Sequence, residues 1–146
     1  MVSIWMNSIP ELDLDDIPIG YARKFNIVLS ESLLLTFSGL SGDQNPLHVD
    51  KEYAEKTVFK RRVIPGMLMA SFFSKLVGMY IPGKRALYVG QTLKFINPSY
   101  IDDEITVEGK VISKSKATRL ITMQTTITNS KGQCLVEGEA KVLVRK

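Results

Sequence analysis

The chain has 146 residues, of which 45% are hydrophobic and 23% charged, and its net charge is +4. This length suits a single domain with one core, and the composition excludes a disordered chain. The chain lacks the basic stripe with interleaved aromatic residues that nucleic-acid-binding proteins carry, so nucleic acid is not an expected partner. We expect one domain over residues 1–146.

Cysteine content and hydropathy indicate a cytoplasmic protein without a metal site. The only cysteine, Cys134, cannot form an intrachain disulfide, and the sequence has no Cys/His cluster from which to build a zinc site. No apolar run approaches the roughly 18 residues of a membrane-spanning helix, and the N-terminus lacks the basic start of a signal peptide. The sequence therefore predicts neither membrane insertion nor secretion.

The first third of the chain predicts an arm, a strand and short helices. Residues 1–19 contain two prolines and no sustained periodicity, which predicts an irregular N-terminal arm. Residues 21–29 have the pattern of a strand. Ser30 is a suitable cap for a helix through Phe37, and Asp50 for a helix over 51–56. Between these helices, residues 39–46 have the composition of a shaped turn.

The middle of the chain predicts one long buried helix. Residues 67–80 are apolar on nearly all sides, which predicts a helix about 20 Å long. Ser71, Ser74, Lys75 and Gly78 interrupt it with a narrow stripe of small or polar residues. Such a stripe is typical of a face toward a pocket or a subunit partner, and crowded packing against a neighbouring element accounts for it equally well.

Four runs of alternating apolar residues follow, over 87–95, 105–111, 121–127 and 136–144, with a hairpin loop at 129–132. One strand, a helical middle and four strands predict an α+β domain in which an antiparallel sheet packs a long helix against one face. A helix that is apolar on all sides needs more cover than a flat sheet gives. We therefore expect the sheet to wrap around it, or a second protomer to cover it.

Asp43 and His48 are the residues best suited to proton transfer. His48 is the only histidine, and histidine exchanges protons near neutral pH. Asp43 precedes it by five positions in a loop bent by Gly42 and Asn45, so the two side chains can meet and handle a water molecule and a proton. The alternative is structural: an Asx-turn at Asp43, with His48 as a hydrogen-bonding group.

Gly66 lies at the predicted start of the long helix. Unpaired N–H groups and the helix dipole make such a start a site for negative charge, for example the enolate oxygen formed from a thioester. The alternative is that Pro65 and Gly66 simply start the helix.

The segment 37–48 reads Phe-Ser-Gly-Leu-Ser-Gly-Asp-Gln-Asn-Pro-Leu-His. It resembles the motif of the MaoC-like dehydratases, the family that includes the (R)-specific enoyl-CoA hydratases (hydratase 2). Further similarity runs through 66–71, 82–84, 88–91 and Phe95, so the likeness covers most of the chain from Leu34 onward. The resemblance implies a hot-dog fold, in which a sheet wraps around a long central helix, and a homodimer or higher homo-oligomer.

The resemblance also implies a reaction in fatty acid metabolism, the reversible addition of water to a trans-2-enoyl-CoA to give the (R)-3-hydroxyacyl-CoA. Asp43 and His48 would be the acid–base pair, and the Gly66 amide would contact the thioester oxygen. The implied substrate contacts are Asn45, Ser74 and Val77, the last two in the acyl pocket. The acyl group would arrive on CoA or on an acyl carrier protein. No metal or redox cofactor is implied, because the thioester itself acidifies the α-carbon.

Basic residues offer contacts for the CoA phosphates, and a solvated basic surface is the alternative. The candidates are Lys60, Arg61, Arg62 and Lys84.

One residue departs from the family pattern, which usually has His before the helix glycine. Here that residue is Pro65, which has no N–H to donate, so we expect a different entrance shape and substrate preference. Two other functions fit the same fold: an acyl-CoA thioesterase, and a non-catalytic subunit that binds acyl-CoA. The Asp-x-Asn-Pro-x-His pattern favours hydration over the first, and the presence of both Asp43 and His48 argues against the second.

Overall fold

The computed structural model of the chain describes residues 8–146. The alternating runs form one six-stranded antiparallel sheet, in the order β1-β4-β5-β6-β2, with β3 paired to β6. The strands are β1 (Ala22–Val28), β2 (Ala86–Gln91), β3 (Lys94–Phe95), β4 (Glu104–Ser115), β5 (Leu120–Asn129) and β6 (Cys134–Val144). The helices are η1 (Leu14–Asp16, a 3₁₀ helix), α2 (Glu31–Ser41), α3 (Pro46–Val49), α4 (Lys51–Glu55) and α5 (Gly66–Met79).

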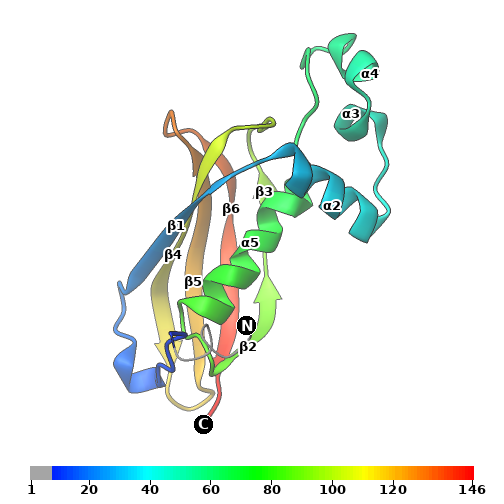
Figure 1. Cartoon of the computed structure of the whole chain (residues 1–146). Coiled ribbons are helices and arrows are strands. Elements are labelled where there is room, and N and C mark those ends of the chain that lie inside the picture. Colours follow the sequence, from blue (N-terminus) through cyan, green and yellow to red (C-terminus); the bar gives the residue numbers. More distant parts are fainter. Residues whose placement is uncertain (1–7) are drawn as a thin grey trace.

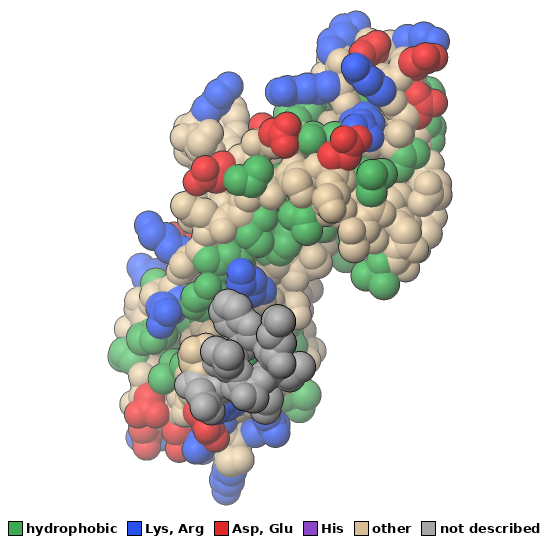
Figure 2. Space-filling model, in the orientation of Figure 1, with side chains coloured by type: hydrophobic (Ala, Val, Ile, Leu, Met, Phe, Trp, Pro, Cys, Tyr) green, Lys and Arg blue, Asp and Glu red, His purple; other side chains and the backbone are tan. Residues whose placement is uncertain are grey.

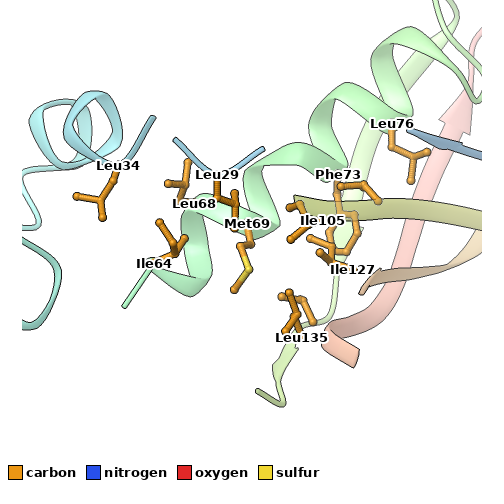
Figure 3. Packing of buried hydrophobic residues seen from close by; sticks show 12 residues of the cluster. Leu29, Leu34, Ile64, Leu68, Met69, Phe73, Leu76, Ile105, Ile127 and Leu135 are labelled. Carbon is orange, nitrogen blue, oxygen red and sulfur yellow. The ribbon is translucent and has the colours of Figure 1, made fainter. Parts of the chain in front are cut away.

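Helix α5 lies along the concave face of the sheet (Figure 1). Its sheet-facing residues, including Met69, Phe73 and Leu76, are at most 2% exposed and pack with Ile105 and Ile127 of the strands (Figure 3). Burial of such side chains typically contributes about 1.5–3 kcal/mol each. The arrangement is the hot-dog fold, so the predicted α+β architecture is confirmed.

The opposite face of α5 is not covered by the sheet. Met67 is 57% exposed, and the polar stripe residues Ser71, Ser74 and Lys75 are exposed as well. Figure 2 shows hydrophobic side chains along this exposed side of the helix. The stripe therefore does not mark crowded packing within the chain, and it is free to face a pocket or another protomer.

Two element boundaries differ from the prediction. The helix after Ser30 continues through Ser41, four residues beyond Phe37, and ends at Gly42, whose φ of 78° is in the left-handed region that favours glycine. The predicted turn over 39–46 is therefore shorter. Its last residue, Pro46, begins the unpredicted helix α3, because proline suits the first turn of a helix and Asn45 caps it.

The predicted run 87–95 is divided into β2 and β3, and its apolar residues face outward in β2. Leu87 and Val89 are 49% and 54% exposed, whereas Tyr88 between them contributes to the core. Alternation alone does not say which face is the inner one. Among residues 8–146 the outer face of β2 is thus exposed, and because β2 is the last strand of the sheet it also has one unpaired edge.

The N-terminal arm, defined here as residues 8–19, is more ordered than predicted. Residues 1–7 of the predicted irregular arm lie outside the described residues. In the arm, Asp13 caps η1 through a capping box, and Leu14 and Ile17 are 4% and 0% exposed in a second core cluster. Lys114 Nζ donates to the carbonyl oxygens of Leu14 and Ile17 at 3.2 and 3.0 Å. The arm is therefore an integral part of the core.

We expect Asp13→Asn to loosen the arm in a pH-dependent way. The backbone N–H of Leu14 and the guanidinium of Arg119 hold the pKa of Asp13 below its usual 3.8. A lowered folded-state pKa contributes stability that is complete above pH 3.8 and is lost as pH falls through the folded value. Asp13→Asn should therefore lower the melting temperature at pH 7, and the difference from the wild type should shrink in acid.

The matched control is Asp15→Asn. Asp15 lies 3.8 Å from Lys116, and both side chains are more than 80% exposed, so this pair contributes little. Equal melting temperatures of the two variants at pH 7 would contradict the anchoring role of Asp13.

Within residues 8–146, no helix is long and apolar enough to cross a membrane.

Candidate active site

The loop between α2 and α3 is held by side-chain hydrogen bonds to the backbone. The Ser38 hydroxyl donates to the Asp43 carbonyl oxygen, and Gln44 Nε2 donates to the Ser38 hydroxyl at 3.0 Å. Asp43 Oδ1 accepts from the Asn45 N–H at 3.1 Å, and Asn45 Oδ1 accepts from the Leu47 N–H at 3.0 Å. These bonds form the Asx-turn that the spacing predicts, and they occupy only one oxygen of Asp43.

The second oxygen of Asp43 faces His48. Asp43 Oδ2 lies 3.8 Å from His48 Nε2, and the two side chains are 43% and 16% exposed. This separation is too long for a direct hydrogen bond, yet short enough for one water molecule to bond both atoms. The structural and the chemical interpretations of Asp43 are therefore compatible, because each uses a different oxygen.

The tautomer of His48 follows from its other nitrogen. His48 Nδ1 lies 2.6 Å from the carbonyl oxygen of Val63, which can only accept, so Nδ1 carries the proton and donates. In the neutral imidazole, Nε2 then has a free lone pair on the side of Asp43. The backbone at Val63 thus orients the ring and leaves Nε2 available to take a proton.

Gly66 is the first residue of α5, after the N-cap Pro65. Its amide has no acceptor within the helix, as is true of the first N–H groups of any α-helix. A Cβ atom at this position would lie 2.6 Å from Cδ1 of Phe95, so a larger residue here displaces the 51%-exposed Phe95 ring or the helix start. The ring of Phe95 thus packs directly on the backbone at the start of the helix.

Asp43, His48 and Gly66 line one cavity of about 1000 Å³. Most of its wall is apolar, from α2, the segment before α5, α5 itself and the edge strands, which suits a ligand with a hydrocarbon part. The apolar lining includes Phe37, Phe59, Val63, Ile64, Pro65, Met67, Met69, Ala70, Leu93, Phe95 and Ile96. An acid–base pair and a helix N-terminus therefore face an apolar cavity.

Comparison with known proteins gives the family. A family model described as "MaoC like domain" matches residues 17–133. The chain belongs to the MaoC-like family. It is 42% identical over 130 residues to the (R)-specific enoyl-CoA hydratase of Rhodospirillum rubrum, covering 89% of this chain and 90% of that protein.

Solved structures of two R-hydratases have the same fold. The R-hydratase PhaJ1 from Pseudomonas aeruginosa is 31% identical with a TM-score of 0.90, over 94% of this chain and 88% of that one. The (R)-hydratase from Aeromonas caviae is 36% identical with a TM-score of 0.85, over 88% and 97%. With relatives named as hydratases and dehydratases, this MaoC-like chain is an enzyme of the hydro-lyase class.

A polar network that the sequence reasoning did not single out lies in the same cavity wall. Tyr88 and Gln91 both line the cavity; the Tyr88 hydroxyl donates to Gln91 Oε1, and Gln91 Nε2 donates to the hydroxyl of Thr125 at 2.9 Å. Burial raises the pKa of Tyr88 to about 12, so its hydroxyl stays protonated. The sequence signals were the family likeness over 88–91 and Gln91 itself, a polar residue at an apolar position of the alternation.

The remaining predicted contacts are distributed over three places. Ser74 lines the cavity of this MaoC-like chain, but Val77 does not: it is 2% exposed and packs in the second core cluster. Asn45 serves as the cap of α3 and is absent from the cavity lining.

The basic candidates lie outside the cavity. Lys60, Arg61 and Arg62 line a separate, smaller pocket beside α4, near one of the ends of the molecule where charged side chains gather (Figure 2). Arg62 pairs with Glu31, and the Arg61 guanidinium lies 3.7 Å from the centre of the Tyr100 ring. Lys84 follows the other end of α5, about 20 Å of helix away. Within one chain, Lys84 cannot join the other three at one phosphate group.

Proposed function

We propose that the protein adds water reversibly to trans-2-enoyl-CoA, giving (R)-3-hydroxyacyl-CoA. The observation that carries this proposal is the pairing of Asp43 Oδ2 with the free Nε2 of His48, 3.8 Å apart in an apolar cavity. The names of its relatives, (R)-specific enoyl-CoA hydratase among them, supply the substrate class.

In the proposed mechanism, Asp43 and His48 hold one water molecule between them. His48 Nε2 takes a proton as the water oxygen bonds to C3, and the electrons of the double bond move to the thioester oxygen. The imidazolium, next to the Asp43 carboxylate, then returns this proton to C2. One group on one side of the substrate handles both steps, so hydrogen and hydroxyl add to the same face.

The Gly66 amide is the proposed donor to the enolate oxygen. A backbone N–H at a helix start is fixed before the reaction and is favoured by the helix dipole, and such donors typically contribute about 3–4 kcal/mol to the transition state. Pro65 has no N–H, so of Pro65 and Gly66 only Gly66 can donate a backbone hydrogen bond to the enolate oxygen. No metal or redox cofactor enters the proposed chemistry, because the thioester provides the electron acceptor.

We also propose that the protein acts as a homodimer. The apolar residues exposed at the sheet edge and the cavity rim, among them Leu87, Val89, Phe95 and Ile96, are each at least 47% exposed in the single chain. An unpaired edge strand with an apolar face is a typical site of association. A second copy would cover this edge and the open side of α5.

Val89→Glu should disrupt this dimer. A charge on the outer face of β2 would be buried without a partner, so the variant should sediment as a monomer and lose most of its activity. Gln124→Glu places the same side chain on the exposed face of β5, away from the edge, and should remain dimeric. A dimeric and active Val89→Glu variant would exclude association through β2.

We propose Lys60, Arg61 and Arg62 as the contact for CoA phosphates. Replacing Lys60 and Arg61 together with alanine should raise KM severalfold at low salt, and the effect should shrink at high salt because exposed charges are screened. Lys116→Ala, which removes an 81% exposed lysine elsewhere, is the control. An unchanged KM at low salt would assign the phosphates to other residues.

The deciding experiment follows crotonyl-CoA by two signals at once. A hydratase removes the absorbance of the conjugated enone without releasing thiol, an acyl-CoA thioesterase releases free thiol, and a non-catalytic binding subunit changes neither. We expect the first result. Thiol release at a rate equal to the loss of absorbance would replace hydration with thioester hydrolysis.

A further inference from the structure

The cavity has a definite inner end along α5. The cavity-lining residues of this helix run from Gly66 to Ser74, which is about 12 Å of helix axis. Val77, one turn further, is 2% exposed and lies in the second core cluster instead. The open space therefore stops between Ser74 and Val77.

Tyr88 closes the same end from the side of the sheet. It lines the cavity and packs against both core clusters, so it lies at the boundary between open space and packed core. Its hydroxyl is fixed by Gln91, which in turn bonds the fully buried Thr125. Tyr88 and Val77 thus form the boundary of the cavity, called here the end wall.

The N-terminal arm belongs to the core behind this wall. Leu14 and Ile17 are in the same cluster as Val77, with Tyr88 packed against it. The arm is held by the Asp13–Arg119 ion pair and by the Lys114 contacts, and by a hydrogen bond from the Leu12 N–H to the Pro82 carbonyl oxygen at 3.2 Å. Figure 1 shows the arm, in dark blue, at the end of the sheet opposite α2, α3 and α4.

We propose that Leu14 and Ile17 of the arm determine the longest acyl chain that the enzyme accepts. Protein cores are close-packed, so Val77 and Tyr88 can move away from an acyl chain only if space exists behind them. Leu14 and Ile17 are part of the core cluster that fills that space. This inference rests on the proposed function, since it concerns the acyl chain of the same substrate.

The test is the acyl-length profile of Ile17→Ala. kcat/KM is measured with crotonyl-, octenoyl-, decenoyl- and dodecenoyl-CoA, all trans-2 isomers. We expect the kcat/KM of the wild type to fall steeply once the acyl chain is longer than the about 12 Å of open cavity beside α5. In Ile17→Ala the ratio of dodecenoyl-CoA to crotonyl-CoA should rise about tenfold or more, because one methylene that fits or does not fit a pocket changes kcat/KM by about 10- to 200-fold. Crotonyl-CoA hydration itself should be unchanged.

Ile105→Ala is the matched control. It deletes the same atoms from a side chain that is also 0% exposed, but in the first core cluster, which does not contain the arm. Its length profile should equal that of the wild type. Ile17→Val, which removes one methyl group, should shift the profile in the same direction by less, and it serves if Ile17→Ala does not fold.

A double variant tests whether Ile17 acts by supporting Val77 or by contacting the acyl chain itself. If Ile17 acts by supporting Val77, the effects of Val77→Ala and Ile17→Ala on the length ratio should not multiply in the double variant. Equal profiles for Ile17→Ala and Ile105→Ala, or a flat wild-type profile, would overturn the inference while hydration stands. A wild-type protein that hydrates none of the four substrates overturns the proposed function itself, and with it this inference.

Discussion

His48→Ala is expected to lower kcat/KM for crotonyl-CoA by about 1,000-fold, the middle of the range for loss of a positioned general acid–base group. The imidazole is the only group of its kind in the chain, and its Nε2 is the atom left free by the bond from Nδ1 to the Val63 carbonyl oxygen. The measurement is a steady-state assay of the enone absorbance, with the circular dichroism spectrum checking that the variant is folded.

Asp43→Asn tests the second member of the pair by removing its charge alone. Asparagine can still accept the hydrogen bond from the Asn45 N–H through its amide oxygen, so the loop is retained while the charge opposite His48 is lost. We expect a loss of activity of about 100-fold or more. The control is Asp50→Asn, the same change at the cap of α4, where asparagine also caps well.

These three variants test whether Asp43 and His48 are catalytic. The control should keep its activity and melting temperature. If His48→Ala and Asp43→Asn both retained near-normal hydration, the pair would have no catalytic role and its hydrogen bonds would be structural only.

Gly66→Ala is the second substitution with a large expected effect, a fall in kcat of about 100-fold, the scale associated with misplacing a reacting group by about 1 Å. The new methyl group would lie 2.6 Å from Phe95 Cδ1, so either the ring or the helix start must shift. A shift of the helix start moves the amide that faces the thioester oxygen. Because KM depends less on this contact than kcat does, kcat should fall much more than KM changes.

Gly78→Ala is the matched control on the same helix. A Cβ atom at Gly78 meets nothing within 4 Å in the single chain, so this substitution should raise stability, by up to about 1 kcal/mol, and leave kcat unchanged in a variant that sediments as the wild type does. The double variant Gly66→Ala/Phe95→Ala removes the ring that the methyl group would meet, and its melting temperature should recover relative to Gly66→Ala. A fully active Gly66→Ala enzyme would show that the start of α5 tolerates the shift.

Much of the fold follows from periodicity. The period of two over residues 105–111 and 121–127 correctly predicts strands β4 and β5, and Ile105, Val107, Ile121 and Met123 are all 0% exposed. The continuous apolar character of 67–80 correctly predicts the one long helix. Both predictions succeed because side-chain direction repeats with the local backbone geometry, which needs no knowledge of distant residues.

The sequence left the faces of the strands open and misplaced some ends of the elements. Alternation did not say that Leu87 and Val89 lie on the outer face of β2, and the length of α2 depends on the left-handed φ of Gly42. The sequence reasoning also overlooked the Tyr88–Gln91 bond in the cavity wall. Each of these is set by contacts between segments or by the dihedral angle of one residue.

The sequence by itself determined the antiparallel sheet with its long helix, the residue types Asp43 and His48 at a spacing of five, and glycine at the helix start. Only the tertiary structure decided that Val63, fifteen residues further along, fixes the tautomer of His48, and that Phe95 packs on Gly66. It also decided that Val77 lies behind the cavity, beside the arm, and not in it. The physical reason is that spacing records only the local path of the chain, whereas a hydrogen-bond direction or a cavity wall arises where distant segments meet.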